Sequence, residues 1–181
     1  LGDTLKFVAG PQTDYFRSPD GSVVNNSAVI FTEVDNTKPF TFTAKVQPEF
    51  TETGTYSAGV IYAYENDTHC QKLCFEQDEY GDHRVVSVRT LGTSDDNNHQ
   101  AITAPYVYMR LSSDGTTLGS YFSEDGKIWR MARLYKNDFP EKLLIGISSQ
   151  SPKDNEHTCL FTEVSLTDKP VADFRKGNIA E

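Results

Sequence analysis

The chain has 181 residues, 37% of them hydrophobic and 12% aromatic, which is enough to bury a core of its own as one domain. Its net charge of −9 at pH 7 argues against a nucleic-acid partner, because a phosphate-binding surface needs clustered Lys and Arg. No apolar run approaches the roughly 20 residues that a membrane-spanning helix needs. We therefore expect a single domain over residues 1–181 with neither a nucleic-acid nor a membrane partner.

Short segments with the alternation of β-strands recur along the whole chain, and no long amphipathic helix interrupts them. The clearest period-two pattern places Phe40, Phe42, Ala44 and Val46 on one face and polar residues on the other. The polar segment 93–104 has the composition of a loop. The candidate strands are 4–8, 28–32, 40–46, 56–65, 69–77, 84–91, 105–112, 143–150 and 158–166.

A late Asp-Gly pair, Asp125-Gly126, predicts a β-hairpin. A tight type I′ turn needs positive φ angles, which Gly accepts freely and Asp tolerates. The strand before the turn alternates through Leu118 and Phe122, and the expected return strand carries Trp129. A hairpin of this kind, in a chain of alternating strands, predicts an all-β fold: an antiparallel sandwich of two sheets.

Three cysteines, Cys70, Cys74 and Cys159, bear on the redox environment. Cys70 and Cys74 lie about 13 Å apart along one strand, too far for a disulfide between them. A bridge from Cys159 to either one stays open, but we predict three buried free thiols. The odd number, together with the lack of a signal-like apolar segment, favours a cytoplasmic location, although a start at Leu1 is also typical of a processed chain.

Assigning faces to the strands gives a candidate ligand-binding surface. We expect Leu73 and Phe75 to face the core, and likewise Val86 with Val88 and Val107 with Met109. The alternate positions would then share one polar and aromatic sheet face, and such faces suit sugars because rings stack on them and charged groups bind hydroxyls. Ordinary ion pairs on a solvated sheet are the competing interpretation. The candidate ligand-binding residues are Lys72, Glu76, Arg89, Tyr108, Arg110 and Tyr121.

Several motifs, in order, resemble a known family over about residues 13–166. They are Thr13-Asp14-Tyr15-Phe16, Lys72-Leu73-Cys74-Phe75-Glu76, Ser94-Asp95-Asp96, the Ser-Glu-Asp-Gly-Lys-Ile-Trp run ending at Trp129, and Gly146-Ile147-Ser148-Ser149-Gln150. They look like the domain-of-unknown-function family that includes the fungal regulation-of-enolase protein. The resemblance implies a concanavalin A-like jelly-roll sandwich, related to lectins and glucanases, followed by a C-terminal tail over 167–181. It implies no catalytic residues.

Three functions remain as hypotheses. The first is a non-catalytic module that binds a carbohydrate or another polar ligand, without a cofactor. The second is a glycan-active hydrolase in which Glu76 is one carboxylate, although the acid series on its strand is incomplete and an ion pair from Glu76 to Lys72 or Arg89 is the simpler expectation. The third is a regulatory protein-interaction module. A calcium site in the segment Asp95–Asn98 is a weaker expectation than a plain polar turn, so we predict no metal site.

Overall fold

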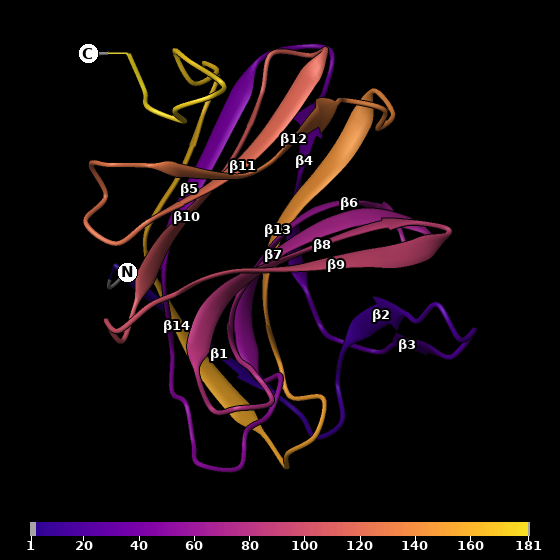
Figure 1. Ribbon diagram of the computed structural model, residues 1–181. Coiled ribbons are helices and arrows are strands. Elements are labelled where there is room, and N and C mark those ends of the chain that lie inside the picture. The colour runs from indigo at the N-terminus through magenta and orange to yellow at the C-terminus, as the bar shows by residue number, and fades with distance from the viewer. Residues whose placement is uncertain (1–2, 181) are drawn as a thin grey trace.

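The computed structural model describes residues 3–180, and they form two stacked antiparallel sheets (Figure 1). The predicted all-β sandwich is therefore confirmed. The first sheet has the strand order β1 (Thr4–Ala9), β14 (His157–Thr167), β5 (Phe40–Pro48), β10 (Val107–Ser113), β11 (Thr117–Ser123) and β12 (Arg130–Lys136). The second has the order β4 (Ile30–Asp35), β13 (Lys142–Gln150), β6 (Ala58–Asn66), β7 (His69–Gln77), β8 (His83–Leu91) and β9 (Thr93–Ala101).

The main core lies between the inner faces of the two sheets. The alternating strand β5 contributes Phe42 and Val46, as its period-two pattern predicts, and β7 contributes Leu73 and Phe75 from the opposite sheet. All four side chains are buried. Burial of an aliphatic or aromatic side chain of this size contributes about 1.5–3 kcal/mol, so this layer holds the sheets together.

A smaller apolar cluster lies on the outer face of the second sheet. Tyr62, Cys74 and Val86 are buried there, although they point away from the main core. A hairpin of β2 (Tyr15–Arg17) and β3 (Val23–Asn25) covers part of this cluster and projects from the sandwich (Figure 1). Tyr15 packs edge-on against Tyr62 with ring centroids 6.1 Å apart. The second sheet is thus partly covered on its outer side as well.

Arg17 fixes the hairpin to the far edge of the second sheet. Its Nη1 lies 3.2 Å from Asp67 Oδ2, and its Nε donates to the Gly92 carbonyl at 3.0 Å. Its backbone N–H donates to Ser94 Oγ, also at 3.0 Å. These contacts bridge between 50 and 77 residues of sequence, so the hairpin is held at a defined position over the sheet.

The C-terminal segment 168–180 runs over the outer face of the first sheet (Figure 1). Thr41 Oγ1 donates to the Lys169 carbonyl at 2.6 Å, and the Tyr121 hydroxyl donates to the Phe174 carbonyl at 2.8 Å. Gly177 has φ of 72°, in the left-handed region that Gly accepts without strain. A Cβ at this position would run into the ring of Tyr121, so Gly allows the segment to lie close to the sheet.

The structure corrects two predictions of local structure. The polar segment at 93–104 is not a loop: most of it is strand β9, at the edge of the second sheet, where polar side chains remain in solvent. The connection at Asp125-Gly126 is longer than a two-residue turn, since β11 ends at Ser123 and β12 begins at Arg130. Asp125 Oδ1 accepts backbone N–H groups of Lys127 and Ile128, both at 2.8 Å, which closes a wider loop.

All three cysteines are buried free thiols, as predicted.

Within residues 3–180 no helix is long and apolar enough to cross a bilayer.

Candidate binding cleft

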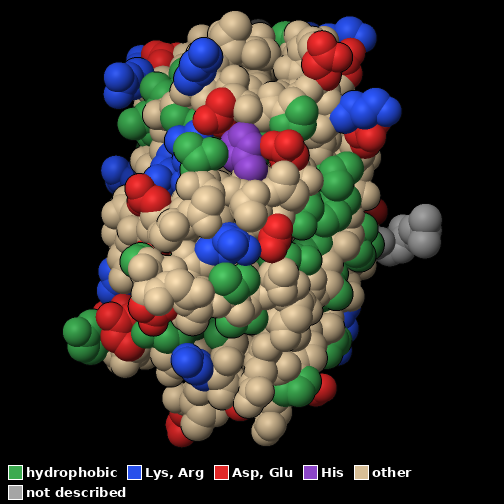
Figure 2. Space-filling model, turned by 90° about the vertical axis from the view of Figure 1, so that its right-hand side faces the viewer, with side chains coloured by type: hydrophobic (Ala, Val, Ile, Leu, Met, Phe, Trp, Pro, Cys, Tyr) green, Lys and Arg blue, Asp and Glu red, His purple; other side chains and the backbone are tan. Residues whose placement is uncertain are grey.

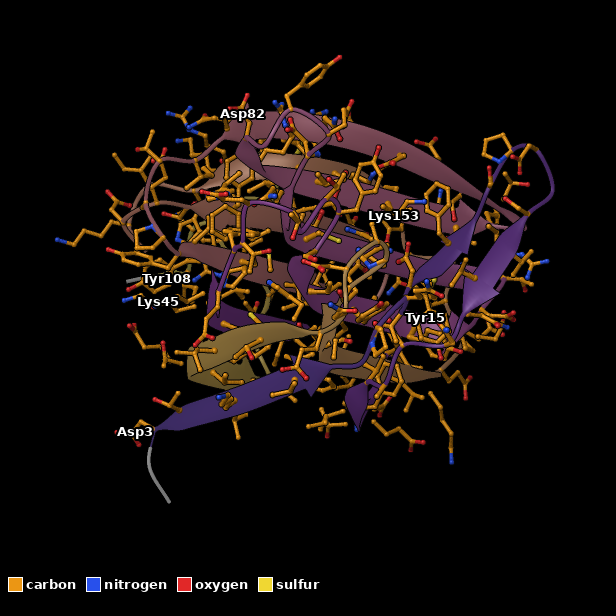
Figure 3. The ribbon with its side chains drawn as sticks, turned by 90° about the horizontal axis from the view of Figure 1, so that it is seen from below. Asp3, Tyr15, Lys45, Asp82, Tyr108 and Lys153 are labelled. Carbon is orange, nitrogen blue, oxygen red and sulfur yellow. The ribbon has the colours of Figure 1, made fainter. Side chains whose placement is uncertain are left out.

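A hollow of about 880 Å³ lies over the outer face of the second sheet. Strands β7, β8 and β9 form its floor, and the β2–β3 hairpin forms one wall. Lys153, on a loop beside it, and Tyr15 of the hairpin lie on the same side of the molecule in Figure 3. The residues that line it include Gln12, Asp14, Phe16, Tyr56, Lys72, Glu76, Glu79, Val86, Val88, Asp96, Asn98, Gln150 and Lys153.

The register of the three floor strands determines which residues face the cleft. Lys72, Val88 and Asp96 lie in one row across β7, β8 and β9. Cys74 and Val86 belong to the next row, together with Asn98. Side chains in one row point to the same face of a sheet. The floor is therefore apolar in the middle, on β8, and polar on either side.

Lys72 is the centre of a hydrogen-bonded network in the cleft wall. Its side chain is only 3% exposed, and its Nζ lies 2.7 Å from Asp14 Oδ1 and 3.2 Å from Gln150 Oε1. Gln150 Nε2 in turn donates to the Tyr56 carbonyl at 3.1 Å and, more weakly, to Glu76 Oε2 at 3.5 Å. A buried ammonium needs such partners, because an unpaired charge away from water is costly.

Burial and neighbouring charges shift the pKa values of the ionisable groups in the cleft. It raises the pKa of Glu76 well above the usual value, and the positive charge of Lys72 only partly opposes this. Asp96, at the more open side, also has a raised pKa because of desolvation. For Lys72, desolvation acts to lower the pKa, but the charge of Asp14 outweighs it with the help of other acidic neighbours, so the pKa is raised. The cleft thus holds a lysine paired with an aspartate and two carboxyls whose pKa burial raises.

Two residues on the cleft wall have a strained backbone. Gln12 and Tyr56 have φ of 54° and 64°, and both line the hollow. Among residues 3–180, only one other non-glycine residue has a positive φ, namely Glu163. Such conformations cost about 1–3 kcal/mol each and concentrate at functional sites. The strain is therefore an independent pointer to this cleft.

The six predicted ligand-binding residues do not share one face. Lys72 and Glu76 line the cleft, as described above. Arg89 faces the opposite side of its sheet, where its Nη2 pairs with Asp138 and its guanidinium lies 4.2 Å from the centroid of the Tyr135 ring. The remaining three, Tyr108, Arg110 and Tyr121, lie on the outer face of the other sheet.

Figure 3 shows this separation: Tyr108 and Lys45 lie next to each other, far across the molecule from Tyr15. Tyr121 and Arg110 are hydrogen-bonded to the C-terminal segment, so their side chains are not free for a ligand in the cleft. The expectation of one shared face required all these strands to belong to one sheet. The strand order places β7 and β8 in one sheet and β10 and β11 in the other.

The error for Arg89 arises from a different cause, the sidedness of β8. This strand carries Val85, Val86 and Val88, so hydrophobicity alone does not define its inner face. Val85 pairs with Phe75 and faces the main core, whereas Val86 and Val88 face the cleft. The expected ion pair of Glu76 with Lys72 or Arg89 is also wrong, because Asp14 and Asp138 occupy those two cations.

Several cleft residues escaped the sequence analysis. Asp14 and Gln150 reach Lys72 from 58 and 78 positions away, a contact that no local pattern signals. The polar composition predicts a turn for Asp96 and Asn98, whereas their spacing of two residues indicates that both face one side of a strand, as the structure shows. Within residues 3–180 no three His, Cys, Asp or Glu side chains are grouped so that they could hold a metal ion.

The match to a family decides what kind of protein this is. Residues 1–169 match the family described as "Protein of unknown function (DUF1349)". The chain belongs to this family. No match to the chain was found among curated proteins.

Several solved structures share this fold. A functionally unknown protein from Saccharomyces cerevisiae is 23% identical, with a TM-score of 0.83 over 93% of this DUF1349 chain and 89% of that one. The GH43 protein BlXynB from Bacillus licheniformis has a TM-score of 0.69 at 14% identity over 91% of this chain but only 33% of its own length. An alginate lyase from Pseudomonas aeruginosa, 12% identical, has a TM-score of 0.55 over 93% and 84%. Identities this low establish the shared fold alone.

Proposed function

We propose that this DUF1349 domain binds a polar, hydroxyl-rich ligand, namely a carbohydrate, in the cleft on the second sheet. The observation that carries the proposal is that Lys72 is already neutralised inside the wall by Asp14, at 2.7 Å. On the floor of the cleft, the groups left to meet a ligand are then the carboxyl and amide groups of Glu76, Asp96 and Asn98. The amide both donates and accepts hydrogen bonds and the carboxyl oxygens accept them, which is what sugar hydroxyls require.

The cleft's charge favours a neutral glycan over a polyanionic one. Its lining includes the acids Asp14, Glu76, Glu79 and Asp96, against the cations Lys72 and Lys153. A ligand with many carboxylates would meet like charges there, which costs free energy. The apolar floor and Phe16 supply surface for the C–H face of a sugar ring. Two distant fold neighbours, a GH43 protein and an alginate lyase, support a glycan as the ligand but say nothing of its charge.

A glycan array probed with the purified domain would test the proposal, followed by calorimetric titration of the best neutral oligosaccharide. Substitution of Asn98→Ala should weaken binding about tenfold, because a ligand would lose a hydrogen bond in a partly desolvated site. Asn97→Ala is the matched control, since the neighbouring side chain on β9 points to the other face. A blank array, or equal losses for both variants, would reject the cleft as a carbohydrate site.

Glycan hydrolysis is the second candidate, and the raised pKa of Glu76 favours it. A carboxyl whose pKa is raised by burial keeps its proton to higher pH, which suits it to act as a general acid. The strand register speaks against Asp96 as its partner: the two residues are separated by two strand spacings and four positions along the strand, about 16 Å between Cα atoms. Hydrolysis of a bound glycan that Glu76→Gln abolishes would establish this candidate; binding that survives Glu76→Gln without turnover favours the non-catalytic module.

A further inference from the structure

Arg110 is a buried cation without an acidic partner among residues 3–180. It lies on β10, on the outer face of the first sheet, and is 4% exposed. Its Nε donates to Thr43 Oγ1 at 2.9 Å, its Nη1 donates to the Gly177 carbonyl at 2.5 Å, and its guanidinium carbon lies 3.6 Å from the centroid of the Trp129 ring. Burial lowers the pKa of Arg110 to about 10, and no carboxylate acts to raise it.

The other arginines that are at least partly buried have acidic partners. Arg17, Arg84, Arg89 and Arg133 each form an ion pair with an aspartate. Arg110, the most buried of them, is the exception within residues 3–180. A guanidinium has five N–H donors, and the two neutral acceptors here satisfy two of them. Three donors and a full charge remain without a counterion from this part of the chain, which is an unfavourable arrangement.

An open hollow lies beside this charge. It has a volume of about 360 Å³, and its lining contains a second cation, Lys127, and an amide, Asn178, but no carboxylate among the described residues. Gly126 has φ of 72° and packs against the Tyr108 ring, so the loop that follows β11 folds back and forms one side of the hollow. Two positive charges and an amide donor around one cavity form a site for an anion.

We propose that this hollow binds a compact oxyanion, a carboxylate or phosphate group of a small ligand, through the free edge of the Arg110 guanidinium with Lys127 at the rim. The planar guanidinium pairs with two oxygens of such a group at once. The site lies on the opposite sheet from the proposed carbohydrate cleft and does not depend on it. Its chemistry is also opposite, because acids outnumber cations in the lining of the cleft, whereas this hollow is lined by two cations and no acid among the described residues.

The position of the chain's single tryptophan makes the proposal directly testable. Trp129 is that residue, and its ring is stacked on Arg110. Tryptophan fluorescence should therefore change in a saturable way when the full chain is titrated with sodium phosphate, sodium acetate or sodium glucuronate at constant ionic strength, and not with sodium chloride. The same oxyanion should raise the melting temperature, since it binds the folded state alone. Comparison of the three salts tells a phosphate site from a carboxylate site.

Variants on the same sheet face assign the signal to the site. Arg110→Gln should weaken binding at least about tenfold, because a charge-assisted bidentate contact is lost. Lys127→Ala, at the exposed rim, should weaken it about threefold. Lys45→Ala is the matched control and should leave affinity unchanged, because Lys45 lies instead over the Tyr106 ring, with Nζ 4.0 Å from its centroid.

Three results would overturn the proposal: no saturation with any oxyanion, an equal response to chloride, or unchanged affinity in Lys127→Ala and Arg110→Gln. If Arg110→Gln does not fold, Lys127→Glu decides the matter, since reversing the charge at the rim must abolish binding by repulsion. Unchanged affinity in that variant would reject the site.

Discussion

The outer faces of the two sheets differ in what covers them. On the second sheet a hairpin packs along one side and leaves a hollow of about 880 Å³. On the first sheet the C-terminal segment lies against the strands, with Tyr121 bonded to its Phe174 carbonyl at 2.8 Å. Both faces bury a cation, but Lys72 has a carboxylate partner and Arg110 has none among the described residues.

This contrast separates two kinds of binding surface within one fold. A cleft whose cation is neutralised from within presents neutral and acidic groups to a ligand, which suits hydroxyls. A hollow whose cation is unpaired presents positive charge, which suits an oxyanion. The face shown in Figure 2 has neither character, because basic and acidic side chains are interspersed on it. The way each buried charge is compensated, rather than the fold, therefore decides what each face can bind.

The largest expected effect comes from removing the partner of Lys72. Asp14→Ala leaves an ammonium with 3% side-chain exposure without its carboxylate. We expect a loss of about 3–5 kcal/mol in the free energy of unfolding, measured by urea denaturation, because an uncompensated buried charge is strongly unfavourable. If the loss were below 1 kcal/mol, water or another group would have to compensate Lys72, and the two faces would not differ in the proposed way.

Two further variants control this experiment. The double variant Asp14→Ala with Lys72→Met removes both charges and should recover most of the lost stability. Glu79→Ala removes an exposed acid at the same cleft and should change stability by no more than about 0.5 kcal/mol. Recovery in the double variant without loss in Glu79→Ala would assign the effect to the pair.

Much of the fold follows from the sequence because strand periodicity is local. The alternation through Phe42 and Val46 predicts both the strand and its inner face, and the structure agrees. β8 shows where this reasoning fails: with Val85 and Val86 adjacent, both faces are apolar, since one meets the core and the other meets the cleft floor. Sidedness there depends on the covering hairpin, which lies far away in the sequence.

The candidate site is less predictable than the fold for a related reason. The sequence predicts that Lys72 and Glu76 share a face because they lie four residues apart on one strand, and this relation is local. Asp14 joins them only because Arg17 and Tyr15 fix the hairpin against the sheet. Arg110 was predicted as a ligand-binding residue, but its sheet could not be assigned, because strand order is set by pairing between distant segments.

A smaller effect is expected where the C-terminal segment meets the first sheet. Gly177→Ala places a side chain at φ of 72° and against the Tyr121 ring, so we expect a loss of about 1–2 kcal/mol from the backbone alone, with a further loss from the contact. Hydrogen exchange of the segment together with the melting temperature would measure it.

Gly21→Ala is the matched control for this variant. Gly21 has φ of 93°, but its Cβ would meet nothing within 4 Å. The two variants therefore share the backbone strain and differ in the contact with Tyr121. Equal losses of stability in the two variants would mean that Gly177 does not lie in close contact with the Tyr121 ring. The outer face of the first sheet would then be less tightly covered by the C-terminal segment than we infer.

The smallest expected effect is a gain in stability on the cleft side. Burial raises the pKa of Glu76, so the folded state holds its proton to higher pH than the unfolded chain does. Between the unfolded pKa of about 4.3 and the raised folded value, the native state binds more protons, and stability must fall as pH rises. Glu76→Gln removes this cost and should stabilise the protein at pH 7 by about 1 kcal/mol. The gain should disappear below pH of about 4, where Glu76 is protonated in both states.

Urea denaturation from pH 4 to pH 8 would measure this difference, with Glu79→Gln at the exposed rim as the control that should show little change. A gain independent of pH would mean that Glu76 affects packing rather than charge. A gain that grows with pH through the predicted window would mean that the fold keeps an ionisable carboxyl in this cleft at a cost in stability. A structural polar network offers no reason for such a cost, whereas a ligand that contacts the carboxyl does.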